Sequence, residues 1–268
     1  MHALLCVGVS RKHLKKVSVC CENPAGTEIL ISLSLAIMYT FQHFIMSNIH
    51  LIIEERAASI GKFLVGRLLP FREKRMVGPF IYIDHMGPVK LSERENFDIL
   101  PHPHIGLSTL TFLFEGSILH RDTLGNAVEI KPGAVNWMTA GKWIVHSERT
   151  PEYLRHADKY MHGLQIWVAL PKELEQMEPE FFHIDAAQIP TWTVADLQFK
   201  LVAGEAFGHR SAVPVYSKLF MIEIKSSSRQ SVNIGHECAG FPLDGSQNVS
   251  GCYQHFAKPG QSGLVPAG

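Results

Sequence analysis

Histidine is the residue type that first suggests chemistry in this chain, which has 15 histidines among 268 residues. His102 and His104 stand in a Pro-His-Pro-His run, and His146 and Glu148 form a second pair further along. In an extended strand, residues two apart project from the same face, so each pair would present two side chains in one direction. Two such strands facing each other across a barrel would make a four-point cup.

The residue types in this cup indicate a transition metal. Three imidazoles and one carboxylate suit a divalent ion such as iron, manganese, nickel, copper or zinc, whereas calcium and magnesium prefer more oxygen ligands. A His-x-His pair alone is weak evidence, because paired histidines also occur by chance or on solvated hairpins. The two pairs together, in a β-rich chain, predict a metal site formed by His102, His104, His146 and Glu148.

Several neighbouring residues allow two interpretations. Phe112, Trp137 and Met138 would line an apolar substrate pocket, or they would be ordinary barrel packing. Asp84 and His85 would orient a ligand imidazole, or they would pack a turn. The segment His120-Arg121-Asp122 precedes a turn and is interpreted as a surface strand end held by salt bridges.

The elements expected to position these residues are short β-strands. From residue 49 onward, segments rich in β-branched and aromatic residues are separated by Gly, Pro and Asn turns every 8–12 residues, which is typical of a sandwich or barrel. Turns are predicted at residues 124–126 and 131–133, and a short helical turn at residues 171–177. The expected class is therefore all-β.

Composition narrows the functional classes. Apolar types make up 46% of the chain and charged types 19%, which excludes disorder, collagen and coiled coil. The formal net charge is zero, so direct nucleic-acid binding is not expected. The five cysteines stand near the two ends, with none from residue 22 to 237, which favours a reducing cytoplasm and leaves histidines and carboxylates as the candidate ligands.

The N-terminal apolar run, residues 29–41, contains no charged residue. It is shorter than the roughly twenty residues that a membrane-spanning helix needs, so no membrane segment is predicted. Acidic residues and a proline separate this run from the upstream lysines, which argues against an export signal. We interpret residues 1–45 as an N-terminal extension outside the fold.

Six segments resemble the pirin family of cupin proteins, and they occur in the family's order between about residues 50 and 236. The segments are MVGPFIYIDHMGP, HPHIGLSTLTFLFEG, HRDTLGN, WMTAGKWIVHSERTP, HGLQIWVALP and PVYSKLFMIEI. The resemblance implies a bicupin of two antiparallel jelly-roll barrels with one Fe(II) held by His102, His104, His146 and Glu148. It also implies two alternative functions, because some pirins resemble flavonol dioxygenases (quercetinases) and others act as redox-sensitive transcriptional cofactors.

The resemblance assigns residues 46–170 to an N-terminal barrel with the metal site and residues 171–236 to part of a C-terminal barrel. Residues 237–268 are rich in Gly, Ser and Pro and depart from the family, so we interpret them as an aberrant tail, with a frameshift as a hypothesis, that leaves the second barrel incomplete. Many cupins carry a glutamate where Ser108 or Thr109 stands here, which removes one possible acid or base.

Two functions follow as expectations. In the first, Glu148 is both ligand and catalytic base of a dioxygenase that acts on a flavonol or similar small aromatic substrate. In the alternative, the same iron site has no catalytic role, and its oxidation state changes the affinity for a protein partner.

Overall fold

The computed structural model describes residues 2–8, 19–20, 53–227, 231–232, 238–242 and 263–266. Its strands are β1 (His2–Gly8), β2 (Val19–Cys20), β3 (Ile53–Glu54), β4 (Arg56–Ile60), β5 (Phe63–Leu69), β6 (Phe80–Leu91), β7 (Asp98–His104), β8 (Leu107–Glu115), β9 (Ile118–Asp122), β10 (Ala127–Ile130), β11 (Val135–Thr139), β12 (Ile144–Arg149), β13 (Lys159–Ala169), β14 (Glu180–Ile184), β15 (Thr191–Val194), β16 (Leu197–Ala206), β17 (His209–Arg210), β18 (Phe220–Ser226), β19 (Ser231–Val232), β20 (Cys238–Pro242) and β21 (Gly263–Pro266). Three short 3₁₀ helices, Glu152–Leu154, Lys172–Leu174 and Ala186–Gln188, complete the described elements.

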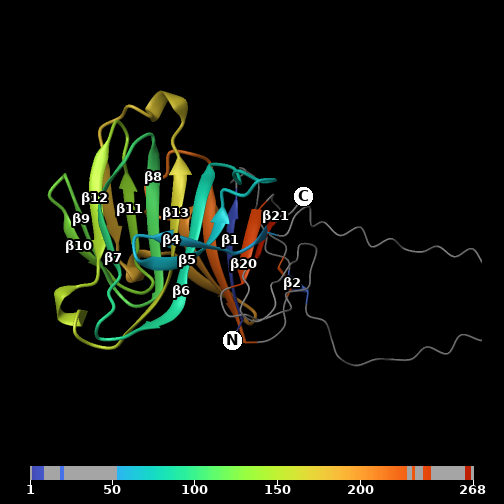
Figure 1. Cartoon of the computed structure of the whole chain (residues 1–268). Helices are drawn as coiled ribbons and strands as arrows, with labels where there is room; N and C mark the ends of the chain where they lie inside the picture. The colour runs from blue at the N-terminus through green and yellow to red at the C-terminus, as the bar shows by residue number, and fades with distance from the viewer. Residues whose placement is uncertain are drawn as a thin grey trace, which may run out of the picture.

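The strands form antiparallel sheets, which confirms the all-β prediction. One sheet has the order β10-β9-β12-β7, and a second has the order β14-β11-β8-β13-β6-β5-β4. A third contains β15-β16-β18-β1-β20-β21-β3, with β17 beside β16. Figure 1 shows β7, β9, β10 and β12 at one side of the molecule and β1, β20 and β21 at the other, with the second sheet between them.

The middle sheet carries different side chains on its two faces, because successive residues of a strand alternate. On β8, Leu110 and Phe112 join a buried cluster that includes Val202 and Met221 of the third sheet. Leu113 points the other way and joins a cluster with Ile118 of the first sheet. Two apolar cores therefore hold the three layers together. Thr109 and Thr111 share with Leu113 the inner face of the middle sheet, which is the face toward the first sheet.

The predicted local features agree with the structure. Gly125 lies in the turn between β9 and β10, where its N–H donates to the carbonyl of Asp122 at 3.2 Å. Gly133 has a φ of 82° in the second predicted turn. The 3₁₀ helix Lys172–Leu174 begins after Pro171, inside the predicted helical turn.

Residues 1–45 were expected to lie outside the fold, but the part of this segment that the structure describes includes a paired strand. Residues 2–8 form β1, which pairs with β18 on one side and with β20 on the other. Val7 is fully buried in the cluster between the sheets, because the apolar residues of this segment fit a central strand. The remaining residues of the predicted extension and tail, including the apolar run 29–41, lie mostly or wholly outside the described residues, and the domain boundaries stay predictions.

A search of the described residues for membrane spans found no helix with the length and apolar character that crossing a bilayer requires.

The turn between β11 and β12 sets the position of the strand that carries His146 and Glu148. Gly141 has a φ of 52° there, and its carbonyl accepts a hydrogen bond from Gly106 at 2.8 Å. A Cβ atom at this position would lie 2.1 Å from the carbonyl oxygen of Met177. Both the backbone conformation and the close neighbour therefore require glycine.

Gly141→Ala should destabilise the protein more than Gly125→Ala. Gly125 also has a positive φ of 91°, but a Cβ atom there meets nothing within 4 Å. Gly125→Ala should cost about 1–2 kcal/mol for the left-handed backbone alone, and Gly141→Ala should add about 1–3 kcal/mol of overpacking. Urea denaturation of both variants measures the difference, and equal losses would contradict this account of the turn.

Candidate metal centre

The two histidine pairs lie on neighbouring strands. β7 and β12 are hydrogen-bonded neighbours, and His102 stands directly opposite His146 in the antiparallel register. The expectation that the two strands face each other across a barrel is therefore wrong. Directly opposite residues of an antiparallel pair share one face of the sheet, which is why the side chains still converge.

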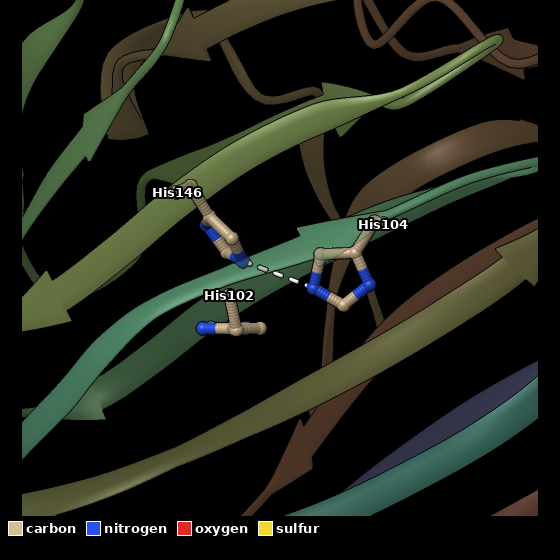
Figure 2. A group of neighbouring side chains, drawn as sticks. All are labelled: His102, His104 and His146. Carbon is tan, nitrogen blue, oxygen red and sulfur yellow. Dashed lines mark hydrogen bonds between the residues drawn. The ribbon is translucent and has the colours of Figure 1, made fainter.

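His102, His104 and His146 form a group in which one ring nitrogen from each residue lies within 4.8 Å of the others. The Nε2 atoms of His104 and His146 are 3.1 Å apart. Figure 2 shows the three rings turned toward one another, with His102 and His104 on one strand and His146 on the next. Such a group of imidazole nitrogens can hold a divalent metal ion.

The hydrogen bonds of the rings indicate which nitrogens would bind the ion. His102 Nδ1 lies 2.8 Å from the carbonyl oxygen of Leu100. A carbonyl accepts only, so His102 carries its proton on Nδ1 and leaves Nε2 with a lone pair. His102 would therefore present Nε2 as its ligand atom, and the Nε2 atoms of His104 and His146 lie next to each other in the same group.

Burial keeps two of the three imidazoles, His104 and His146, uncharged at neutral pH. Burial, with a smaller contribution from nearby His102, lowers the pKa of His104 to about 4. Burial also lowers the pKa of His146 to about 2, and the neighbouring histidines add to this shift. Metal binding requires neutral imidazole, so the metal meets little competition from protons at neutral pH. The donor set thus fits the divalent transition metal expected from the sequence.

Glu148 lies on the same strand but is not a member of the three-histidine group. A register shift separates the pair His146–His102 from the pair Glu148–Ile99, and β7 has one more residue than β12 between them. Glu148 is 5% exposed, and burial raises its pKa to about 7. Glu148 thus lies on the same face of β12 as His146. Its role as a metal ligand stays a proposal.

A single hydroxyl group connects Glu148 to the middle sheet. Thr111 Oγ1 lies 3.1 Å from Glu148 Oε1 and 2.9 Å from Gln165 Oε1. A hydroxyl has one proton to donate, so it cannot donate to both oxygens at once. A protonated Glu148 would satisfy all three groups by donating to Thr111, which would then donate to Gln165. When Glu148 is ionised, Thr111 donates to it instead, and this hydrogen bond partly opposes the rise that burial causes in the pKa of Glu148.

His120 and Asp122 were interpreted as a surface strand end, and the structure corrects this. His120 is 3% exposed, its ring stacks on Phe181 at 4.4 Å, and burial lowers its pKa. The Asp122 side chain is completely buried and accepts a hydrogen bond from His120 Nε2 at 3.0 Å. The surface interpretation failed because β14, which is distant in sequence, brings Phe181 over this strand end.

A second set of residues near the site was missed by sequence reasoning. The ring of Trp167 meets the ring of His104 edge-on at 5.0 Å and stacks on Tyr82 at 4.0 Å. Arg67 binds both carboxylate oxygens of Asp84 at 2.8 Å, and its Nη2 also contacts the hydroxyl of Tyr82. These aromatic and charged groups therefore reach the histidine group through Trp167.

His85 does not orient a metal ligand of this group. Its Nδ1 lies 2.7 Å from Glu55 Oε1, and its Nε2 lies 3.0 Å from His162 Nε2. The preceding residue, Asp84, pairs with Arg67 instead, because neighbouring residues of β6 point to opposite faces of the sheet. The structure thus separates the two residues that the sequence placed together.

The predicted pocket residues lie mainly in packed cores. Phe112 and Trp137 are 1% exposed and belong to the cluster between the second and third sheets, which agrees with the alternative that they are ordinary barrel packing. Met138 packs with Ile144 and Phe181 in a separate small cluster. The indole Nε1 of Trp137 donates to Thr139 at 3.0 Å, which gives this buried ring its polar partner.

Comparison with known proteins gives consistent matches. Residues 62–168 match the family model described as Pirin. A Caulobacter vibrioides protein named Pirin-like protein is 52% identical over 177 residues, which cover 65% of this chain and 61% of that protein. A Pseudomonas aeruginosa protein with the provisional name quercetin 2,3-dioxygenase is 38% identical over 207 residues, which cover 75% of this chain and 63% of that protein. The chain thus spans less than two thirds of the length of both relatives.

Solved structures support the same relationship. A crystal structure of quercetin 2,3-dioxygenase from Acinetobacter baumannii has a TM-score of 0.60 and 26% identity, and the match covers 81% of this chain and 78% of that one. Another quercetin 2,3-dioxygenase structure from the same organism has a TM-score of 0.63 at 20% identity and shows the shared fold alone. Because the matched residues 62–168 include the whole histidine group, and the Caulobacter relative is 52% identical, the chain belongs to the pirin family of the cupin superfamily.

Proposed function

We propose that this protein is an iron-dependent dioxygenase of the quercetin 2,3-dioxygenase type, acting on a flavonol or a similar small aromatic molecule. The observation that carries the proposal is the buried three-histidine group, whose ring nitrogens lie within 4.8 Å of one another. The relatives with quercetin dioxygenase names agree with it. The proposed reaction adds dioxygen to the flavonol, opens its heterocycle and releases carbon monoxide.

The histidines would bind the ion, and other residues would act on the substrate. A divalent iron held by three imidazoles would supply open coordination positions for a substrate oxygen and for dioxygen. Trp167, which stacks on Tyr82 and meets the His104 ring edge-on, is an aromatic side chain beside the histidines against which a substrate ring would pack. His102 is the partly exposed member of the group, so substrate would enter from its side.

Glu148 is the proposed base. A flavonol would bind through its 3-hydroxyl oxygen after loss of the hydroxyl proton, and a base is most effective when its pKa lies near the working pH. The buried Glu148 carboxyl, with its pKa raised to about 7, meets this requirement. Thr111 holds the carboxyl group in place by a hydrogen bond and would keep contact with it when the proton arrives.

A second candidate function is the redox-sensing module with a protein partner. Three large apolar side chains in or next to the strands that carry the histidines favour it, because Leu100, Ile105 and Trp143 are 66%, 67% and 52% exposed. Exposed apolar patches commonly mark protein contacts. In this alternative, the iron oxidation state would change the affinity for the partner, and the purified protein would not oxidise flavonols.

Purified protein loaded with Fe(II) should hold one equivalent of metal and consume quercetin under air. His146→Ala removes one of three imidazoles and should abolish both properties, because two imidazoles bind a divalent ion much more weakly. Elemental analysis measures the metal, and absorbance measures quercetin. Bound iron without quercetin turnover would reject the dioxygenase and favour the sensing module, and unchanged metal in His146→Ala would reject the site itself.

The metal-free protein should lose stability as the pH falls from 6.5 toward 4. In this range the unfolded chain protonates His104 and His146, while the folded chain keeps them neutral because their pKa values are about 4 and about 2. Glu148 opposes this trend. Its raised pKa means that the folded protein takes up a proton at a higher pH than the unfolded chain does, which favours the folded state as the pH falls. Urea denaturation across this range should show a flatter pH dependence for His146→Gln and a steeper one for Glu148→Gln, and identical slopes would contradict the assignment.

Glu148→Gln should retain metal but lower the rate of quercetin oxidation about 100-fold or more, which is the usual contribution of a general base. Thr111→Val is the matched variant that keeps the carboxyl group. Because the Thr111 hydrogen bond lowers the pKa of Glu148, its loss should move the acidic limb of the pH–rate profile to higher pH. Full turnover in Glu148→Gln would exclude Glu148 as the base.

A further inference from the structure

We propose that Asp122 and His120 are positioning residues for the metal centre, which fix the proton of His146 on Nδ1 and so keep its Nε2 ready for the ion. This inference rests on the proposed metal site. It assigns a role to two residues that make no direct contact with a substrate. The evidence is a chain of hydrogen bonds that runs from a buried carboxylate to a ligand imidazole.

The chain begins at Asp122, whose position is fixed by donors. Asp122 Oδ1 accepts hydrogen bonds from the backbone N–H groups of Leu124 and Asn126 at 2.9 and 3.1 Å. The side-chain amide of Asn126 donates to Oδ2 at 2.9 Å. The carboxylate therefore cannot rotate without losing several bonds in the turn between β9 and β10. It offers Oδ2 to His120 in a fixed direction.

The carboxylate of Asp122 determines which nitrogen of each ring carries the proton. An ionised carboxylate accepts hydrogen bonds only, so His120 Nε2, at 3.0 Å from Asp122 Oδ2, must be the donor. A neutral imidazole has one N–H group, which leaves the Nδ1 of His120 as an acceptor. His120 Nδ1 lies 3.4 Å from His146 Nδ1, so the proton in this longer bond belongs to His146.

The position of this proton determines which nitrogen of His146 is available to a metal ion. With its proton on Nδ1, His146 has a lone pair on Nε2, the atom that lies 3.1 Å from His104 Nε2. The stacking of Phe181 on His120 keeps the intermediate ring in the plane that this chain requires. His102 reaches the same tautomer by a different route, since its Nδ1 donates to the carbonyl of Leu100. Two ligands thus have their tautomers set by partners on the side away from the proposed ion.

Asp122→Asn is the decisive variant. The side-chain amide would donate to His120 Nε2, place the His120 proton on Nδ1, and force the His146 proton onto Nε2. Binding of Co(II) to the full-length protein, measured by competition with a chelator, should weaken about 10- to 100-fold, as is typical when partners behind a metal ligand are lost. In the metal-free protein, long-range ¹H–¹⁵N spectra should show that His146 changes from the Nδ1–H to the Nε2–H tautomer.

Two variants of His120 give an independent test. His120→Phe keeps a ring against Phe181 but removes the acceptor, so it should weaken Co(II) binding as Asp122→Asn does. His120→Asn places a carbonyl oxygen close to the position of Nδ1, so it should restore most of the affinity. A merely structural role would not give this rescue. Asp98→Asn is the control, because Asp98 lies on β7 but pairs with Arg155 rather than with a histidine.

The outcomes separate the two proposals. Normal Co(II) affinity and an unchanged His146 tautomer in folded Asp122→Asn, or equal affinities in His120→Phe and His120→Asn, would overturn the positioning role. If those variants bind normally while His146→Ala loses the ion, the metal site stands and only the positioning role fails. If His146→Ala keeps full affinity, the proposed metal centre fails, and the positioning role fails with it.

Discussion

The antiparallel pairing of β7 with β12 is the constraint on which the site depends. The register sets His102 directly opposite His146, and the alternation of side chains adds His104 to the same face. A shift of β7 by one residue would turn His102 and His104 away from the face that carries His146 and bring Pro101 and Pro103 in their place. The turn at Gly141 and the two apolar cores that hold the sheets together therefore support the site by fixing this register.

The histidine rings of the site are stabilised by hydrogen bonds and ring contacts rather than by ion pairs. Burial keeps His104 and His146 neutral, and His146 Nδ1 contacts the imidazole of His120. The partly exposed His102 donates from Nδ1 to the carbonyl of Leu100, and the ring of His104 meets Trp167 edge-on. Burying a polar group without a hydrogen bond is costly, so this arrangement removes part of the cost before any ion binds. An ion would then accept the remaining nitrogen lone pairs. The cost of burying three imidazoles in a barrel without a charged partner would thereby be reduced further.

The sequence allowed prediction of the all-β class, the turns and the three histidines, because these follow from local alternation and local turn residues. It did not allow prediction of which strands are neighbours, since pairing between β7 and β12 depends on the whole topology. It also misjudged His120 and Asp122, because a His-Arg-Asp segment before a turn has the same pattern whether Phe181 covers it or solvent does. The choice between pocket lining and packing for Phe112 stayed open for a related reason, since the pattern alone does not show which apolar face meets a second sheet.

Glu148 decides what such a site can do beyond binding an ion. The same strand alternation that buries His146 buries Glu148, yet the two groups respond in opposite ways, because burial lowers the pKa of an imidazole and raises that of a carboxyl group. At neutral pH the result is an imidazole that is already deprotonated and a carboxyl group that is only partly so. In the proposed function, one buried strand would thus provide a ligand, His146, and a proton acceptor, Glu148. This combination would distinguish a site suited to proton removal from one suited only to holding metal.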